Sequence, residues 1–145
     1  MPFTQVSDIL GRTQKYHHQL AVYYRKIRRT TDRELVRLLA DDLSKRQRFL
    51  GRQLKLFRKP VKDSWMQYDP SYDLERVINE LDPRKKQELE DLFDAGIELN
   101  RRLIKYYCRV AEIAPTTEMK ELFKALERYQ LEGQRALANS VQQVQ

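Results

Sequence analysis

The sequence predicts an all-α protein, a four-helix bundle made of two related helical hairpins that a long crossover joins. Three observations lead to this fold class. Apolar residues recur at steps of three and four along most of the chain, which is the period of amphipathic helices. The internal prolines fall between the periodic segments or at their starts, where they do not break a helix. One long segment of the chain also occurs twice.

The repeated segment sets the register of the predicted bundle. Its first copy carries an inward stripe of Val6, Leu10, Thr13, His17, Leu20, Tyr24 and Ile27. Adding 83 to each number gives a second stripe of similar size: Leu89, Phe93, Gly96, Asn100, Leu103, Tyr107 and Val110. Most members are apolar, but a histidine and an asparagine stand at the two centres. The repeat therefore predicts two equivalent helices with a polar centre between them.

The first hairpin is expected over residues 5–58. Thr4 or Ser7 can cap its first helix, which ends near Arg29. Thr31 and Glu34 have the spacing of a capping box and predict the start of the second helix, which runs to about residue 58. The predicted inward residues of this second helix are Leu35, Leu39, Leu43, Leu50, Leu54 and Phe57, with Arg46 on the same stripe.

The crossover is expected over residues 59–82, where the helical period lapses. Pro60 and Pro70 exclude one long helix, and residues 73–81 can form a short one. Trp65 lies between the two prolines. We interpret it as a side chain that closes the flank of the bundle where the crossover packs; the alternative is an anchor for a partner.

The second hairpin is expected over residues 83–141. Asp82 followed by Pro83 predicts an N-cap and a first helical residue, and Pro115 ends that helix after Ala114. The fourth helix then starts near Thr117. Its predicted inward residues are Leu122, Phe123, Leu126, Gln130, Leu137 and Val141, which match the second helix at an offset of 87. We expect a single domain over residues 1–145.

Composition narrows the class of protein. No apolar run approaches the roughly 20 residues of a membrane span, and the N-terminus has no signal-peptide core, so a cytoplasmic location is expected. The single cysteine, Cys108, has no internal disulfide partner, and its place on a helix beside Tyr107 indicates a small core-boundary side chain rather than a reactive thiol. Glycine-rich phosphate loops and Cys-x-x-Cys pairs are absent from the sequence.

Charge is unevenly distributed along the chain. Residues 1–62 hold 16 Lys/Arg against 5 Asp/Glu, a net of +11, whereas residues 63–145 hold 12 against 16, a net of −4. Such asymmetry can steer an anionic partner or hold the two halves together. The possible anionic-partner patch lies at the first turn and comprises Arg25, Lys26, Arg28, Arg29, Arg33 and Arg37.

The fourth helix carries the pattern Leu122-Phe123-x-x-Leu126-x-x-x-Gln130-x-x-Gly133-x-x-x-Leu137, and Asn100 precedes Tyr107 by seven residues. With glutamate and histidine at the polar positions, this pattern resembles the ferritin-like superfamily, rubrerythrins especially, over about 110 residues. The chain also resembles uncharacterised bacterial proteins with a His-His pair in the first helix and a Trp-x-Gln-Tyr segment in the crossover.

The resemblance implies a di-iron site in metal-binding members, held by a glutamate on two helices and Glu-x-x-His on the other two. In this sequence the six ligand positions become His17 and Asn100, Leu43 and Arg46, and Gln130 and Gly133. None keeps a ligand of the pattern.

We therefore expect no cofactor and a hydrogen-bonded, metal-free centre. It would contain His17, Asn100 and Gln130, with Arg46 at or beside it in the space left by Gly133. Tyr24 and Tyr107 would donate their hydroxyls to these polar groups.

Three functions follow from these features. The first is a non-enzymatic interaction or scaffold protein, acting as a homodimer or with a protein partner. The alternative is a nucleic-acid or polyanion binder that uses the basic first hairpin. The third is an oxidoreductase with a non-standard metal site around His17.

Overall fold

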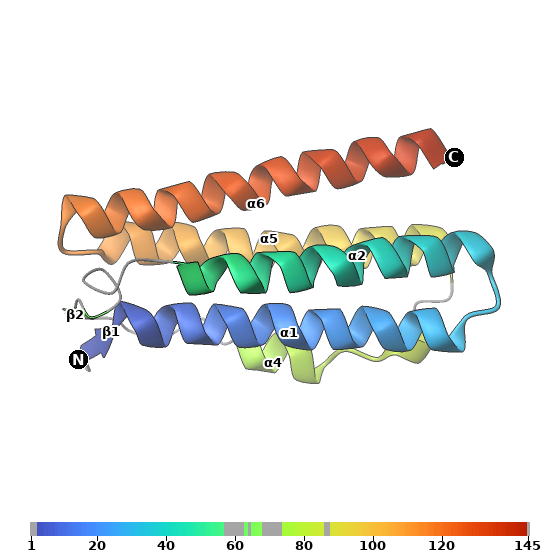
Figure 1. The fold of residues 1–145 in the computed structure, drawn as a ribbon, viewed down its shortest axis with the longest axis horizontal. Coiled ribbons are helices and arrows are strands. Elements are labelled where there is room, and N and C mark those ends of the chain that lie inside the picture. Colours follow the sequence, from blue (N-terminus) through green and yellow to red (C-terminus); the bar gives the residue numbers. More distant parts are fainter. Residues whose placement is uncertain (1–2, 57–62, 64, 68–73, 86–87, 145) are drawn as a thin grey trace.

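The computed structural model describes residues 3–56, 63, 65–67, 74–85 and 88–144. Four long helices lie side by side along its long axis (Figure 1): α1 (Val6–Thr30), α2 (Glu34–Gln53), α5 (Leu89–Ile113) and α6 (Thr117–Val144). α1 packs against α2 and α5 packs against α6, and the turns of the two hairpins lie at opposite ends of the bundle. The predicted all-α bundle of two hairpins is confirmed.

The connection between the hairpins returns along the bundle, so that α2 and α5 run in the same direction (Figure 1). It includes the short helix α4 (Leu74–Asn79), which lies against α1 and falls within the predicted range. The 3-10 turns η1 (Leu54–Leu56) and η2 (Pro83–Lys85) flank the crossover.

One two-stranded sheet contradicts the expectation that the chain contains no strands. β1 (Phe3–Gln5) pairs antiparallel with β2 (Trp65–Gln67), with Thr4 opposite Met66. Each strand has three residues, which is too short for an alternating pattern to be recognised in the sequence. The pair fastens the N-terminal end of the chain to the crossover at one end of the bundle (Figure 1).

The start of α1 differs from the predicted cap. Gln5, rather than Thr4 or Ser7, is the N-cap residue, and its backbone N–H donates to the Asp8 carboxylate at 3.3 Å. Pairing of Gln5 in β1 places the chain in an extended conformation directly before the helix. The cap was missed because that pairing is a tertiary contact.

The starts of α2 and α5 also differ from the predictions. The hydroxyl of Thr31 accepts the N–H of Arg33, which is the actual N-cap of α2. The carboxylate of Asp82 accepts the N–H of Arg84 at 3.0 Å, as a cap does, but it caps the turn η2. The long helix begins after Glu88, six residues later than expected.

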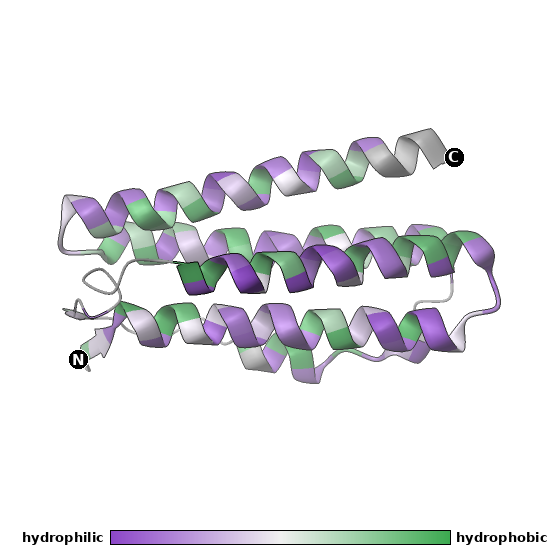
Figure 2. Ribbon diagram, in the orientation of Figure 1, coloured by the Kyte–Doolittle hydropathy of each residue, from purple (hydrophilic) through white to green (hydrophobic). Residues whose placement is uncertain are grey.

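The core lies along the predicted stripes. Leu20 and Leu103, at equivalent positions of the repeat, are each 1% exposed. The prediction fails at Leu35, which is 47% exposed, because the neighbouring Val36 faces the core instead. Figure 2 shows hydrophobic and hydrophilic residues alternating around each long helix. On the second and fourth helices, Leu39, Leu43, Leu54, Phe123, Gln130 and Leu137 are buried as predicted, and Leu50, Leu122 and Leu126 are partly buried.

The crossover closes the core with a different side chain from the one predicted. Trp65 is 58% exposed, whereas Met66, which points to the other side of β2, is 1% exposed. The prediction that Trp65 closes the flank of the bundle is therefore wrong. Phe57 and the side chain of Val141 lie outside the described residues. Among the helices that the structure describes, none combines the length and apolar character of a membrane span.

Candidate functional site

A buried polar pair joins the two helices of the first hairpin. His17 on α1 is 1% exposed, and its Nδ1 lies 2.6 Å from Oε1 of Gln47 on α2. An amide oxygen can only accept, so Nδ1 carries the proton and Nε2 has a lone pair. Burial lowers the pKa of His17 to about 4, although the bond to Gln47 opposes the shift. The imidazole is therefore neutral at neutral pH.

A second polar pair occupies the equivalent place in the other hairpin. The side-chain amide of Asn100 on α5 donates at 3.1 Å to Oε1 of Gln134 and at 3.1 Å to the backbone carbonyl of Gln130, both on α6. Asn100 follows His17 by 83 residues and Gln134 follows Gln47 by 87, which are the two offsets of the sequence repeat. The polar pairs are thus copies of one arrangement.

The two pairs form separate units in the described structure, rather than the single network expected of His17, Asn100 and Gln130. A different bond links the hairpins: the Tyr16 hydroxyl donates at 2.7 Å to the backbone carbonyl of Leu99, its counterpart 83 residues later. Equivalent positions of α1 and α5 therefore meet at this level of the bundle.

Arg46 lies near the predicted place, but for a different reason. Its guanidinium donates to the Asp42 carboxylate at 2.9 Å and to the backbone carbonyl of Gly133 at 3.3 Å, and its side chain is 31% exposed. A Cβ atom added at Gly133 would meet no atom within 4 Å. The inference that the missing side chain makes room for Arg46 is therefore wrong. Arg46 reaches partners at the bundle edge, so no unpaired charge is buried.

The tyrosines that were expected to donate to the polar centre are core residues. Tyr24 and Tyr107 are at most 1% exposed, and burial raises the pKa of both hydroxyls. Thr13 lies beside Tyr107 and donates its own hydroxyl to the Leu10 carbonyl. The structure records no hydrogen bond from either tyrosine to His17, Asn100 or Gln130 among the described residues.

Cys108 is partly buried, and burial together with the neighbouring Glu127 and Glu112 raises the pKa of its thiol. A raised pKa lowers the thiolate fraction, so this cysteine is not activated as a nucleophile.

The residues at the centre do not fit a di-iron group. Such a group needs several carboxylates, both as ligands and to balance its charge. The centre offers one neutral imidazole, with a buried Nε2 that has no hydrogen-bond partner in the described residues, and the four amide side chains of Gln47, Asn100, Gln130 and Gln134. Glu98, the nearest candidate in the sequence, is exposed and binds Arg101 and Arg102 instead. Within the described ranges, no three His, Cys, Asp or Glu side chains come together as a metal site.

The predicted anionic-partner patch is partly neutralised by its own chain. Arg28 pairs with Asp41, Arg33 pairs with Glu88, and the Arg37 guanidinium donates to the Thr31 carbonyl. Three of its six members thus already have partners. A neighbouring groove also carries positive charge.

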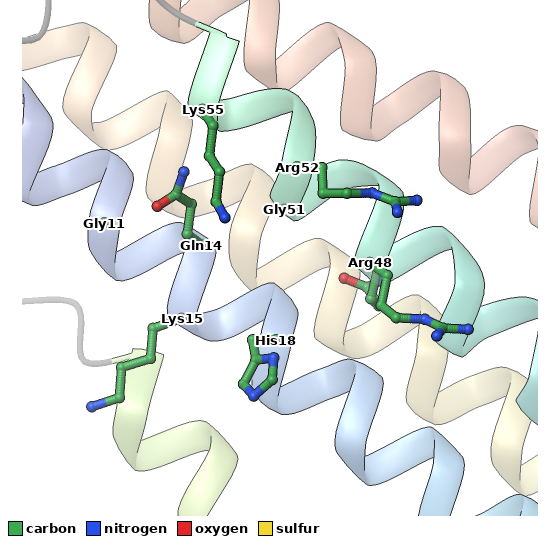
Figure 3. Close-up of a pocket in the computed structure, with 9 residues that line it drawn as sticks. Gly11, Gln14, Lys15, His18, Arg48, Gly51, Arg52 and Lys55 are labelled. Carbon is green, nitrogen blue, oxygen red and sulfur yellow. The ribbon is translucent and has the colours of Figure 1, made fainter.

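This basic groove lies between α1 and α2 and has a volume of about 510 Å³. Its lining residues are Gly11, Gln14, Lys15, His18, Gln47, Arg48, Gly51, Arg52 and Lys55, none of which is acidic. In Figure 3, Gln14 and Lys55 extend toward one another over the space between the helices, and Arg48 and Arg52 extend side by side along α2. Gln47 belongs to both this groove and the buried pair with His17.

Sequence reasoning missed Gln47 and Gln134, which complete the two polar pairs. Polar residues on a largely charged helix look like surface residues in the sequence. The usable signal was the repeat itself, because two glutamines separated by 87 residues match the offset of the second and fourth helices.

Scans of family models and of curated proteins give no match to the chain. Among solved structures, it resembles a provisionally assigned ferritin-like diiron-carboxylate protein from Thermotoga maritima, with 16% identity and a TM-score of 0.61. The likeness covers 100% of this chain and 99% of that chain. At this identity the match shows the fold alone. The fold is ferritin-like, as the sequence pattern predicted.

Proposed function

We propose that this chain is a non-catalytic ferritin-like bundle that acts as a protein-interaction module, and that its partner is a second copy of itself. The observation that carries this proposal is an exposed apolar stripe along the outer side of α2 that continues into the turn η1. The stripe comprises Leu35, Leu38 and Phe49 on α2 and Leu56 in η1, with exposed fractions of 47, 60, 45 and 74%.

The stripe has helical spacing rather than a random scatter. Its members fall at intervals of 3, 11 and 7 residues, which return to one side of a helix. At 1.5 Å per residue the stripe is about 30 Å long. Single exposed apolar residues are ordinary, but a row of this length is typical of an interaction face.

The edge of α6 extends the same face. Phe49 and Tyr129, which is 46% exposed, line an apolar groove of about 300 Å³ together with Leu50, Gly133 and Ala136. A groove beside a protruding aromatic ring is self-complementary, because each copy can place its ring in the groove of the other.

Charge along this face also favours a second copy. The Asp42–Arg46 pair lies within the stripe, and Glu132 lines the groove. Both signs therefore occur on one face, and a twofold contact can bring each sign of one copy against the opposite sign of the other. The neutral amide and imidazole groups at the bundle centre support a role through the surface rather than through catalysis.

The test is the oligomeric state of the full chain. Sedimentation equilibrium should show a dimer when the protein concentration is raised to about 100 μM. The double variant Leu38→Gln/Phe49→Gln should raise the dissociation constant of the dimer by tenfold or more. Trp65→Gln removes an equally exposed apolar side chain at the end of the bundle and should leave the dimer intact. A monomeric wild-type chain, or equal weakening by Trp65→Gln, would contradict the proposal.

A further inference from the structure

We infer that the basic groove between α1 and α2 binds a compact oligophosphate, either inorganic or as the phosphate chain of a nucleotide. This site is separate from the proposed dimer face, since it lies toward α1 rather than α6. The inference rests on the charge, the shape and the polar floor of the groove.

Charge in the groove is concentrated and of one sign. Arg48 and Arg52 are four residues apart on one face of α2, and Lys55 follows three residues later in the turn η1. Like charges four residues apart destabilise a helix unless an anion lies between them. In Figure 3, Arg48 and Arg52 extend in the same direction along α2, away from Gln14 and Lys55, and their planar guanidinium groups can each bind two phosphate oxygens.

The shape of the groove suits a small ligand. Its volume of about 510 Å³ falls in the ordinary range for small-molecule sites. Gly51 allows α1 and α2 to approach, since a Cβ there would come within 3.4 Å of the His17 Cβ, and Gly11 leaves the groove open, since it faces open space. A concave site of this size takes up a short phosphate chain, whereas a nucleic acid duplex requires a longer charged surface.

The floor of the groove supplies a fixed polar group. Gln47 is 9% exposed, and its oxygen is held by His17 Nδ1–H, so the side chain has one orientation. Gln14 extends from α1 over the same space toward Lys55 (Figure 3). Amide groups at the base and cations at the rim are the pattern of a phosphate site, in which neutral donors position the anion and Arg and Lys neutralise it.

Calorimetric titration of the full chain with inorganic tripolyphosphate, and separately with ATP in the absence of metal, tests the inference. We expect saturable binding of one ligand per chain. Arg48→Gln/Arg52→Gln should weaken it by tenfold or more. The matched control is Lys105→Gln/Arg109→Gln, which removes two cations with the same spacing from exposed positions of α5 and should change binding by less than twofold.

The variant Gly11→Leu distinguishes binding inside the groove from binding to diffuse surface charge. It keeps every cation, and the open space at Gly11 accepts the new side chain without strain, yet the leucine fills the groove. Loss of binding in this variant supports the inference. Wild-type affinity in Gly11→Leu, equal weakening in the α5 control, or no saturation would overturn it. Tighter binding of ATP than of tripolyphosphate would identify a nucleotide as the ligand. Equal binding of the two would show that the groove recognises the phosphate chain alone.

Discussion

Acid should destabilise this bundle through one buried histidine. His17 has a pKa of about 4 in the folded chain and 6.5 as the reference value, because its ring is buried away from water. Below pH 6.5 the unfolded chain takes up a proton that the folded chain does not, so stability is lost as the pH falls. The free energy of unfolding that depends on neutral His17 is fully present above pH 6.5 and fully lost below about pH 4.

The size of the effect follows from the difference in pKa. One pKa unit corresponds to about 1.4 kcal/mol, so the full loss is about 3 kcal/mol, of which about 2 kcal/mol falls between about pH 7.5 and pH 5. The ring is 1% exposed, so solvent screening does not reduce this figure appreciably.

Urea unfolding across this pH range measures the loss directly. His17→Asn introduces the residue that the repeat has at position 100, removes the titrating ring and should flatten the profile by about 2 kcal/mol relative to the wild type. His18→Asn is the matched control, because it makes the same substitution at the neighbouring exposed histidine and keeps the buried ring of His17. Parallel profiles for wild type and His17→Asn would refute the reasoning.

Three further predictions concern packing. Leu20→Ala and Leu103→Ala should each lower the free energy of unfolding by about 2–5 kcal/mol, measured in urea, because both remove a buried side chain from an equivalent central position. Met66→Ala should lower the melting temperature measurably whereas Trp65→Ala should scarcely change it; the reverse order would show that the crossover packs as the sequence first indicated. Gly133→Ala should stabilise α6 by up to about 1 kcal/mol in the same urea assay, since the new methyl group meets open space, and destabilisation would restore the idea that Arg46 needs the glycine.

The sequence predicted the helices better than it predicted which side of α2 faces the core. Leu35 and Val36 are both apolar, and adjacent helical residues point about 100° apart, so the period alone accepts either one. The repeat does not decide between them either, because Leu35 matches Leu122 and Val36 matches Phe123 at the same offset of 87. Only the structure shows that Phe123 is fully buried and Leu122 partly buried. A second apolar stripe on the same helix obscured that choice, and this stripe is the face proposed for self-association.

The errors at the element ends have a different origin. The start of α1 depends on the pairing of Gln5 with Trp65, and these residues are 60 positions apart in the sequence. Local capping rules consider only neighbours along the chain, so they selected Thr4 and Ser7. Asp82 shows the same limit, since its carboxylate accepts a neighbouring N–H as a cap should, but the turn it caps does not continue directly into α5.

The neutral polar pairs at the centre explain how this helical bundle can fold without a charged cofactor. A bundle that holds carboxylates at its centre needs a cation, because isolated buried charges are costly. Here each hairpin carries a neutral pair, His17 with Gln47 and Asn100 with Gln134, and each pair is bonded within its own hairpin. Arg46, the one charge on the predicted inward stripe of the second helix, is balanced at the bundle edge by Asp42. The hairpins therefore require no ion between them, and both functions proposed above use the surface of α2 instead.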